Sequence, residues 1–166
     1  KGWDTDLSRY VAVKILAPSI AKNERHRLAF VAEARMASAL KHPHIISIYH
    51  IYSNAATSMA YFVAEWIEGF TLQKWIVDRN TNDSLAPEEK WLRQLVDAVA
   101  EAHENGIVHR DLKPANVLVD QETQNAILID FGLAFEKKDW RGSNSPKGTP
   151  LYMSPEQLKG ERLSQQ

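Results

Sequence analysis

The sequence predicts an α+β fold in which strands come early and the longest helix comes late. Three short runs, 9–16, 45–52 and 59–65, are rich in β-branched and aromatic residues, as strands usually are. A short polar turn separates the second run from the third, which favours an antiparallel hairpin and a small sheet. Two longer segments, 23–40 and 87–105, space their apolar residues as helices do.

Composition excludes several classes of function. The chain has 166 residues and a formal net charge of -1, so it is long enough for a buried core and has no basic excess to bind nucleic acid. It contains no cysteine, which rules out disulfides and cysteine-based zinc sites and fits a reducing compartment. No apolar run is long enough to span a bilayer. We therefore expect no nucleic-acid partner and no membrane segment within this chain.

The first predicted strand and the helix after it each carry a charged residue of interest. Lys14 stands in the apolar run Val11-Ala12-Val13 and Ile15, where a lysine often protects the edge of a sheet. Glu33 lies within the helix 23–40 and by itself would be a solvated carboxylate. The predicted apolar stripe of this helix comprises Leu28, Val31, Ala32, Met36, Ala39 and Leu40.

The sequence predicts further helices after residue 68. Thr71 is a candidate N-cap, and Pro87 with two following acidic residues opens the strongest helix of the chain. Asn105-Gly106 closes that helix as a C-cap. Its predicted buried stripe comprises Leu92, Leu95, Val96, Val99 and Ala102.

The chemistry is concentrated in two motifs, the segment His109 to Asn116 (His-Arg-Asp-Leu-Lys-Pro-Ala-Asn) and the triplet Asp130-Phe131-Gly132. Between them, the apolar runs 117–119 and 126–129 predict a strand hairpin that would hold both motifs rigidly. The motifs offer a carboxylate to accept a proton, oxygen ligands for a cation and a lysine for a phosphate. Phosphoryl transfer needs these groups, although any single aspartate could equally be a turn or cap residue.

In these motifs the chain resembles the eukaryotic-type serine/threonine protein kinases, including those of bacteria. The resemblance implies a partial two-lobed kinase fold: a small antiparallel-sheet lobe with one helix, followed by an incomplete, mainly helical lobe. Residues 1–67 would form the first lobe and the hinge, and residues 68–166 the second lobe through the activation segment. It also implies that the family's glycine-rich loop precedes Lys1 and that further helices follow Glu156.

The resemblance assigns a role to each candidate residue. Lys14, paired with Glu33, would hold the α- and β-phosphates of ATP, and Asp111 would accept the proton of the substrate hydroxyl. Lys113 is typical of kinases that act on serine and threonine. Asn116 and Asp130 would bind Mg²⁺. The adenine would lie between Ala12 and Leu118 and contact backbone groups of Glu65 and Ile67, with Ala64 behind it, although Ala64 would serve equally as a small core residue.

The polar stretch from Leu133 to Gly148 resembles an activation segment, and the alternative is an ordinary surface connection. Ser143 and Ser145 are candidates for activating phosphorylation, and Thr149 for a structural role near the substrate. The expected function is transfer of the ATP γ-phosphoryl group to Ser/Thr hydroxyls of a protein substrate, in the cytoplasm or in the cytoplasmic part of a membrane-anchored kinase. The alternative is an inactive kinase-like module that binds a nucleotide or a partner.

Overall fold

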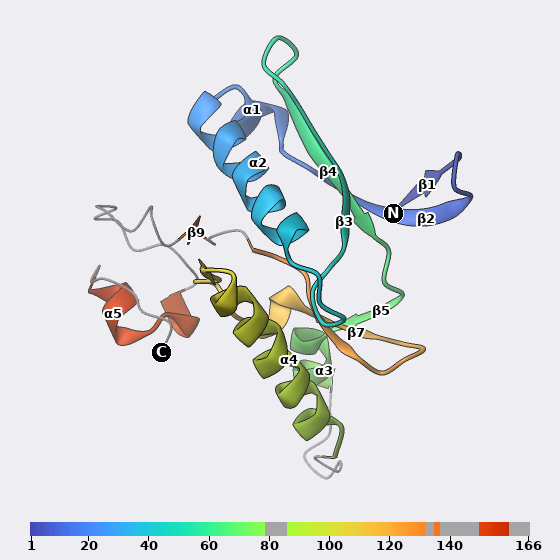
Figure 1. Cartoon of the computed structure of the whole chain (residues 1–166), viewed down its shortest axis with the longest axis vertical. Coiled ribbons are helices and arrows are strands. Elements are labelled where there is room, and N and C mark those ends of the chain that lie inside the picture. The colour runs from blue at the N-terminus through green and yellow to red at the C-terminus, as the bar shows by residue number, and fades with distance from the viewer. Residues whose placement is uncertain (79–85, 132–134, 137–149, 160–166) are drawn as a thin grey trace.

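A computed structural model describes residues 1–78, 86–131, 135–136 and 150–159 (Figure 1). Its elements divide into two sets, each with its own sheet. One set comprises the strands β1 (Gly2–Asp4), β2 (Arg9–Ile15), β3 (Ile48–Asn54) and β4 (Met59–Glu65) with the helices α1 (Pro18–Ala21) and α2 (Glu24–Ala39). The second set comprises β5 (Gly69–Thr71), α3 (Leu72–Asp78), α4 (Ala86–Glu104), β6 (Ile107–Val108), the 3₁₀ turn η1 (Pro114–Asn116), β7 (Val117–Asp120), β8 (Ala126–Leu128), β9 (Phe135–Glu136), the 3₁₀ turn η3 (Pro150–Tyr152) and α5 (Pro155–Leu158).

The first set forms a four-stranded antiparallel sheet in the order β1-β2-β4-β3, with α2 packed along it (Figure 1). This confirms the predicted hairpin, but β3 begins at Ile48 rather than at Ile45. Ile45 and Ile46 lie instead against the second set of elements, where the Ile46 N–H donates to the Leu128 carbonyl at 2.9 Å. The short helix α1, which was not predicted, begins at Pro18.

The helix α2 begins where the sequence predicts, since the Asn23 side chain accepts a hydrogen bond from the Arg25 N–H at 3.0 Å. Its predicted apolar stripe is wrong in part, because Leu28 is 59% exposed. Phe30 is buried instead, with its ring stacked on Phe62 at 5.4 Å. Arg27 also belongs to the buried face, where its guanidinium donates to the Ala21 carbonyl at 2.9 Å. A buried, hydrogen-bonded arginine is invisible to a hydropathy pattern.

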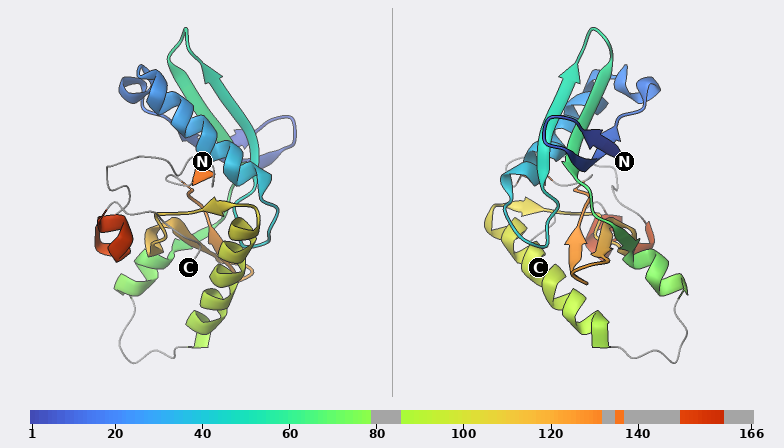
Figure 2. Two further views of the ribbon diagram at one scale, coloured as in Figure 1. Left: turned by 60° about the vertical axis from the view of Figure 1, so that its left-hand side comes forward. Right: turned by 90° about the vertical axis from the view of Figure 1, so that its right-hand side faces the viewer.

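The second set is built around the three-stranded sheet β5-β7-β8, with α3 and α4 beneath it in both views of Figure 2. Gly69 starts β5 at a point of close backbone approach, since a Cβ there would lie 2.0 Å from the Val119 carbonyl oxygen. Thr71 caps α3 as predicted by accepting from the Lys74 N–H at 3.1 Å. Gly106 ends α4 with a φ of 74°, the left-handed conformation of a C-cap glycine.

The buried face of α4 also differs from the predicted stripe. Trp91, Ala98 and Ala102 are buried, whereas Leu92 and Val96 are 64% and 59% exposed. The prediction is right for Ala102, and Leu95 packs against the buried cluster, but Trp91 rather than Leu92 is buried beneath the sheet. Its ring makes edge contacts with Trp75 at 5.2 Å and with Phe70 at 6.4 Å.

Two buried clusters hold the fold together. The upper core lies between α2 and the four-stranded sheet and comprises Phe30, Ala34, Ile46, Ala60, Phe62, Ala64, Ile67 and Ile127. The central core lies between α4 and the second sheet and comprises Ala37, Leu40, Ile45, Trp91, Ala98, Ala102, Ile107, Val117, Val119, Ala126, Leu128 and Phe131. The strand β8 contributes to both, because its successive side chains point to opposite faces.

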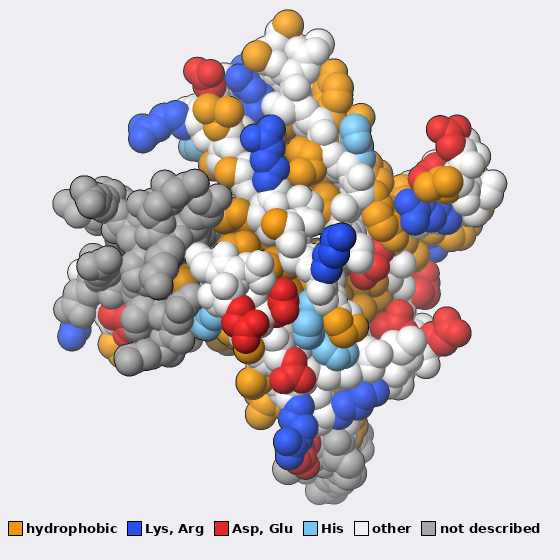
Figure 3. All heavy atoms as spheres, in the orientation of Figure 1, with side chains coloured by type: hydrophobic (Ala, Val, Ile, Leu, Met, Phe, Trp, Pro, Cys, Tyr) orange, Lys and Arg blue, Asp and Glu red, His pale blue; other side chains and the backbone are white. Residues whose placement is uncertain are grey.

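The surface carries charges of both signs. On the face shown in Figure 3, acidic and basic side chains are interspersed among the described residues and form no single basic area. None of the helices in the described residues combines the length and the apolarity needed to cross a bilayer.

Candidate active site

The candidate site is carried by the hairpin of β7 and β8, whose turn is fixed from two sides. Asp120 Oδ1 accepts from the N–H groups of Glu122 at 3.0 Å and Thr123 at 2.7 Å. From α4, Gln94 accepts from the Ala126 N–H and donates to Asn125 Oδ1, both at 2.8 Å. These contacts hold β8, the strand that ends two residues before Asp130.

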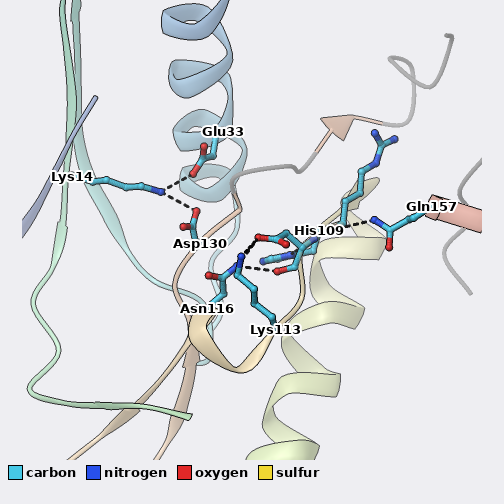
Figure 4. Close-up of polar contacts among 9 residues, drawn as sticks. Lys14, Glu33, His109, Lys113, Asn116, Asp130 and Gln157 are labelled. Atoms are coloured by element: carbon cyan, nitrogen blue, oxygen red, sulfur yellow. Dashed lines mark hydrogen bonds and ion pairs between the residues drawn. The ribbon is translucent and has the colours of Figure 1, made fainter. Parts of the chain in front are cut away.

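Lys14 joins the two sets of elements at the site. Its Nζ lies 3.2 Å from Glu33 Oε1 and 2.9 Å from Asp130 Oδ1, and the three side chains converge in Figure 4. The contact with Glu33 is the one that the sequence predicts, and it argues against an edge-strand lysine and a solvated Glu33. The contact with Asp130 was not predicted.

Burial and charge shift the proton affinities of this cluster. Burial raises the pKa of Glu33 to about 7, and the neighbouring Asp130 adds to the rise while Lys14 opposes it. For Lys14, burial acts to lower the pKa, but the two carboxylates outweigh it and the pKa lies above its ordinary value. The Lys14 ammonium therefore stays charged, whereas Glu33 changes between its protonated and ionised forms near neutral pH.

The loop between β6 and η1 holds Asp111. Lys113 Nζ lies 2.6 Å from Asp111 Oδ2. Asn116 Nδ2 donates to the Asp111 carbonyl at 2.9 Å and to Oδ2 at 3.2 Å. Because Asn116 directs its NH₂ at Asp111, its amide oxygen is the atom suited to a cation.

His109 and Phe131 pack the loop from below. The imidazole is buried, and its centroid lies 4.9 Å from that of the Phe131 ring. Its Nδ1 accepts from the Asp111 N–H at 3.3 Å, which places the proton of the neutral ring on Nε2. Burial lowers the pKa of His109 to about 4.

The residues assigned to adenine binding lie close together. Ala12 and Ala64 are paired across β2 and β4, Ala64 and Ile67 belong to the upper core, and Ala12 and Leu118 pack against it. Glu65 ends β4, and its N–H donates to the Ser47 carbonyl at 3.0 Å. Ala64 is thus a small residue of the core, and it also lies beside the other residues assigned to adenine binding.

The structure thus brings together most of the residues singled out from the sequence. Ser143, Ser145 and Thr149 lie outside the described residues. A residue that sequence reasoning missed is Gln157 of α5, whose side chain reaches the loop at Arg110. The pattern Ser154-Pro155-Glu156-Gln157 signals a capping box but gives no sign of that longer contact.

The donor set suits Mg²⁺ with a nucleotide. Asp130 and Asn116 supply oxygen atoms, which hard cations prefer, and the backbone joins them because the Ile129 N–H donates to the Asn116 carbonyl at 3.0 Å. Lys14 and Lys113 supply positive charge on either side. Oxygen ligands flanked by lysines fit a metal shared with phosphate groups.

Comparison with known proteins agrees with this chemistry. Residues 1–166 match the protein kinase domain family. The chain is 40% identical over 161 residues to serine/threonine-protein kinase PrkC of Bacillus subtilis, covering 95% of this chain and 24% of PrkC. It is 34% identical over 174 residues to serine/threonine-protein kinase PknB of Mycolicibacterium smegmatis, covering 96% of this chain and 26% of PknB.

The chain thus spans about a quarter of the length of these curated relatives. Its mixed α and β architecture with antiparallel sheets is the fold class that the sequence predicts. On the match along its whole length, the chain belongs to the protein kinase family and is related to the bacterial serine/threonine kinases.

Proposed function

We propose that the protein transfers the γ-phosphoryl group of ATP to serine or threonine hydroxyls of a protein substrate. The observation that carries the proposal is the placement of Asp111, held by Lys113 and Asn116, on the loop that leads into the hairpin bearing Asp130. Bound Mg²⁺ and ATP would supply the phosphoryl group and neutralise its charge. Positioning and electrostatic stabilisation are then what the chain itself must provide.

Asp111 accepts the proton of the attacking hydroxyl. Lys113, 2.6 Å from Asp111 Oδ2, pairs with the carboxylate and would present a positive charge to the phosphoryl group. This pairing of a base with a lysine supports a serine or threonine acceptor, because Lys113 is the residue that marks those kinases.

Asp130 and Asn116 would hold the metal, and Lys14 would orient the α- and β-phosphates. The ion pair with Glu33 at 3.2 Å holds the Lys14 ammonium beside Asp130, the candidate metal ligand. Such a partly buried pair contributes to position more than to stability, because desolvation offsets much of its attraction.

The adenine would lie between Ala12 and Leu118 and hydrogen-bond to the backbone of Glu65 and Ile67, with Ala64 behind the ring. The clustering of these residues around the upper core supports this arrangement. In this proposal residues 1–67 act as one lobe with its hinge and residues 68–166 as part of the other. We place the reaction in the cytoplasm, where ATP is available. Ser143 and Ser145 stay candidates for control by phosphorylation, and Thr149 for a structural role near the substrate.

Two sets of substitutions in the intact protein separate binding from chemistry. Asp111→Asn removes the base but leaves the metal ligands, so it should keep ATP–Mg²⁺ affinity and lower turnover by about 10²–10⁴-fold. Lys14→Ala and Asp130→Ala should weaken ATP–Mg²⁺ binding itself. Calorimetry of nucleotide binding and a steady-state assay measure the two effects.

Unchanged turnover in Asp111→Asn would remove that residue from its role. Tight ATP binding by the unaltered protein with no turnover on any protein substrate would favour the non-catalytic alternative.

A further inference from the structure

A hydrogen bond joins α5 to the loop that carries Asp111. The Gln157 side-chain Nε2 donates to the Arg110 carbonyl at 2.8 Å across 47 residues of sequence (Figure 4). The contact is partly buried, so water competes with it less than at an open surface. The nearest backbone neighbour of the acceptor is Asp111.

The cap of α5 fixes the orientation of this amide. The Ser154 N–H donates to Gln157 Oε1 at 3.1 Å, and the Gln157 N–H donates to Ser154 Oγ at 3.4 Å, forming a capping box. The amide oxygen is therefore directed to Ser154, and the NH₂ group is left to face Arg110. A glutamate would satisfy the same capping box but could not donate to the carbonyl.

The acceptor lies at an unusual point of the backbone. Arg110 has a φ of 65°. Residues other than glycine rarely adopt this left-handed backbone conformation, and it persists where the surrounding structure holds it. The peptide between Arg110 and Asp111 is held at both ends. Gln157 binds its carbonyl, and the Asp111 N–H donates to His109 Nδ1 at 3.3 Å. The plane of this peptide sets the direction in which the Asp111 side chain leaves the backbone.

We propose that Gln157 is a positioning residue for Asp111. It holds the Arg110–Asp111 peptide and so couples the placement of α5, which follows the activation-segment candidates in the sequence, to the candidate base. This proposal rests on the proposed function for its effect on catalysis. The hydrogen bond and its effect on the loop do not depend on that function.

The test is Gln157→Glu in the intact protein, which keeps the cap and replaces the donor with an acceptor facing a carbonyl. We expect kcat to fall by about 10–100-fold, the cost of a small misplacement of a reacting group, with the KM for ATP unchanged. The exchange of the Asp111 amide hydrogen should become faster by about 2- to 10-fold, the equivalent of one net hydrogen bond. Gln157→Asn, which is neutral but too short to reach, should act in the same direction.

The matched control is Gln73→Glu. Gln73 Oε1 accepts from the Tyr152 hydroxyl at 3.4 Å, so a glutamate adds the same charge near α5 while keeping its acceptor role. It should leave both kcat and amide exchange unchanged. Equal kcat and equal exchange in Gln157→Glu and the unaltered protein would overturn the proposal, as would a fall of the same size in Gln73→Glu. If the unaltered protein transfers no phosphate but Gln157→Glu still speeds exchange at Asp111, the proposed function fails while the positioning contact stands.

Discussion

Each of the two aspartates central to the site is held by a lysine. Lys113 lies against Asp111, and Lys14 bridges Asp130 and Glu33. Burial raises the pKa of Glu33 to about 7, although Lys14 opposes the rise. A partly buried cluster of this kind gains little net stability from its ion pairs. Its value lies in fixing charged atoms where phosphate and metal would meet them.

His109 makes stability depend on pH. Its pKa in the folded chain is about 4 because the ring is buried, against about 6.5 in the unfolded chain. The unfolded chain therefore takes up a proton first, and stability is fully present above pH 6.5 and lost as the pH falls towards 4. The loss should reach about 2 kcal/mol by pH 5 and about 3 kcal/mol at pH 4.

His109→Phe tests this, because a phenyl ring fills the site beside Phe131 and cannot titrate. The free energy of unfolding of both forms is measured in urea at pH 7 and pH 5. The difference between the two forms removes the contributions of the other titratable groups. The variant should lose less stability between the two pH values, by about 2 kcal/mol. The same loss in both forms would show that His109 titrates normally.

At the scale of elements, the sequence predicted the longer strands, the two hairpins and the caps, because these follow from local spacing, but it missed the short strands β5, β6 and β9. Its prediction of the buried faces of both long helices was wrong in part: Val31 and Ala102 are buried as predicted, but Leu28 and Leu92 are exposed. Those faces are decided by what each helix packs against. Arg27 is buried on α2 and Trp91 on α4, so the buried face of each helix differs from the stripe of apolar residues in its sequence.

The packing of α4 against the β7–β8 hairpin gives a sharp prediction at this scale. Gln94→Leu leaves the Ala126 N–H without its acceptor at a fully buried residue, which should cost about 1–3 kcal/mol. Arg93→Leu, on the exposed side of the same helix, removes only an exposed pair with Glu89 and should cost at most about 0.5 kcal/mol. Urea unfolding at pH 7 compares the two, and equal effects would show that Gln94 does not brace the hairpin.

At the scale of the whole molecule, the candidate site is assembled from both sets of elements. Lys14 and Glu33 come from the first, and Asp111 and Asp130 from the second. Two backbone bonds tie the sets together, since Leu128 donates to the His44 carbonyl and accepts from the Ile46 N–H, both at 2.9 Å. Asp130 follows two residues later, so the strand that carries it is attached to both cores.

The sequence could predict the members of the site but not all of their contacts. Motif spacing identifies Asp111 and Asp130, because each belongs to a short pattern of known chemistry, and the resemblance to the kinase family identifies Lys14 and Glu33. The contact of Lys14 with Asp130 spans 116 residues and that of Gln157 with Arg110 spans 47. Contacts of this kind depend on how distant elements pack, which no local pattern records.

The central claim is that these residues transfer phosphate from ATP to a serine or threonine. The most direct measurement supplies the intact protein with Mg²⁺, a protein substrate and ATP labelled at the γ-phosphate, then identifies the labelled amino acid after hydrolysis. The account predicts label on serine or threonine, dependent on Mg²⁺ and lost in Asp111→Asn. Label released only as inorganic phosphate, label on tyrosine, or label unchanged in Asp111→Asn would contradict it.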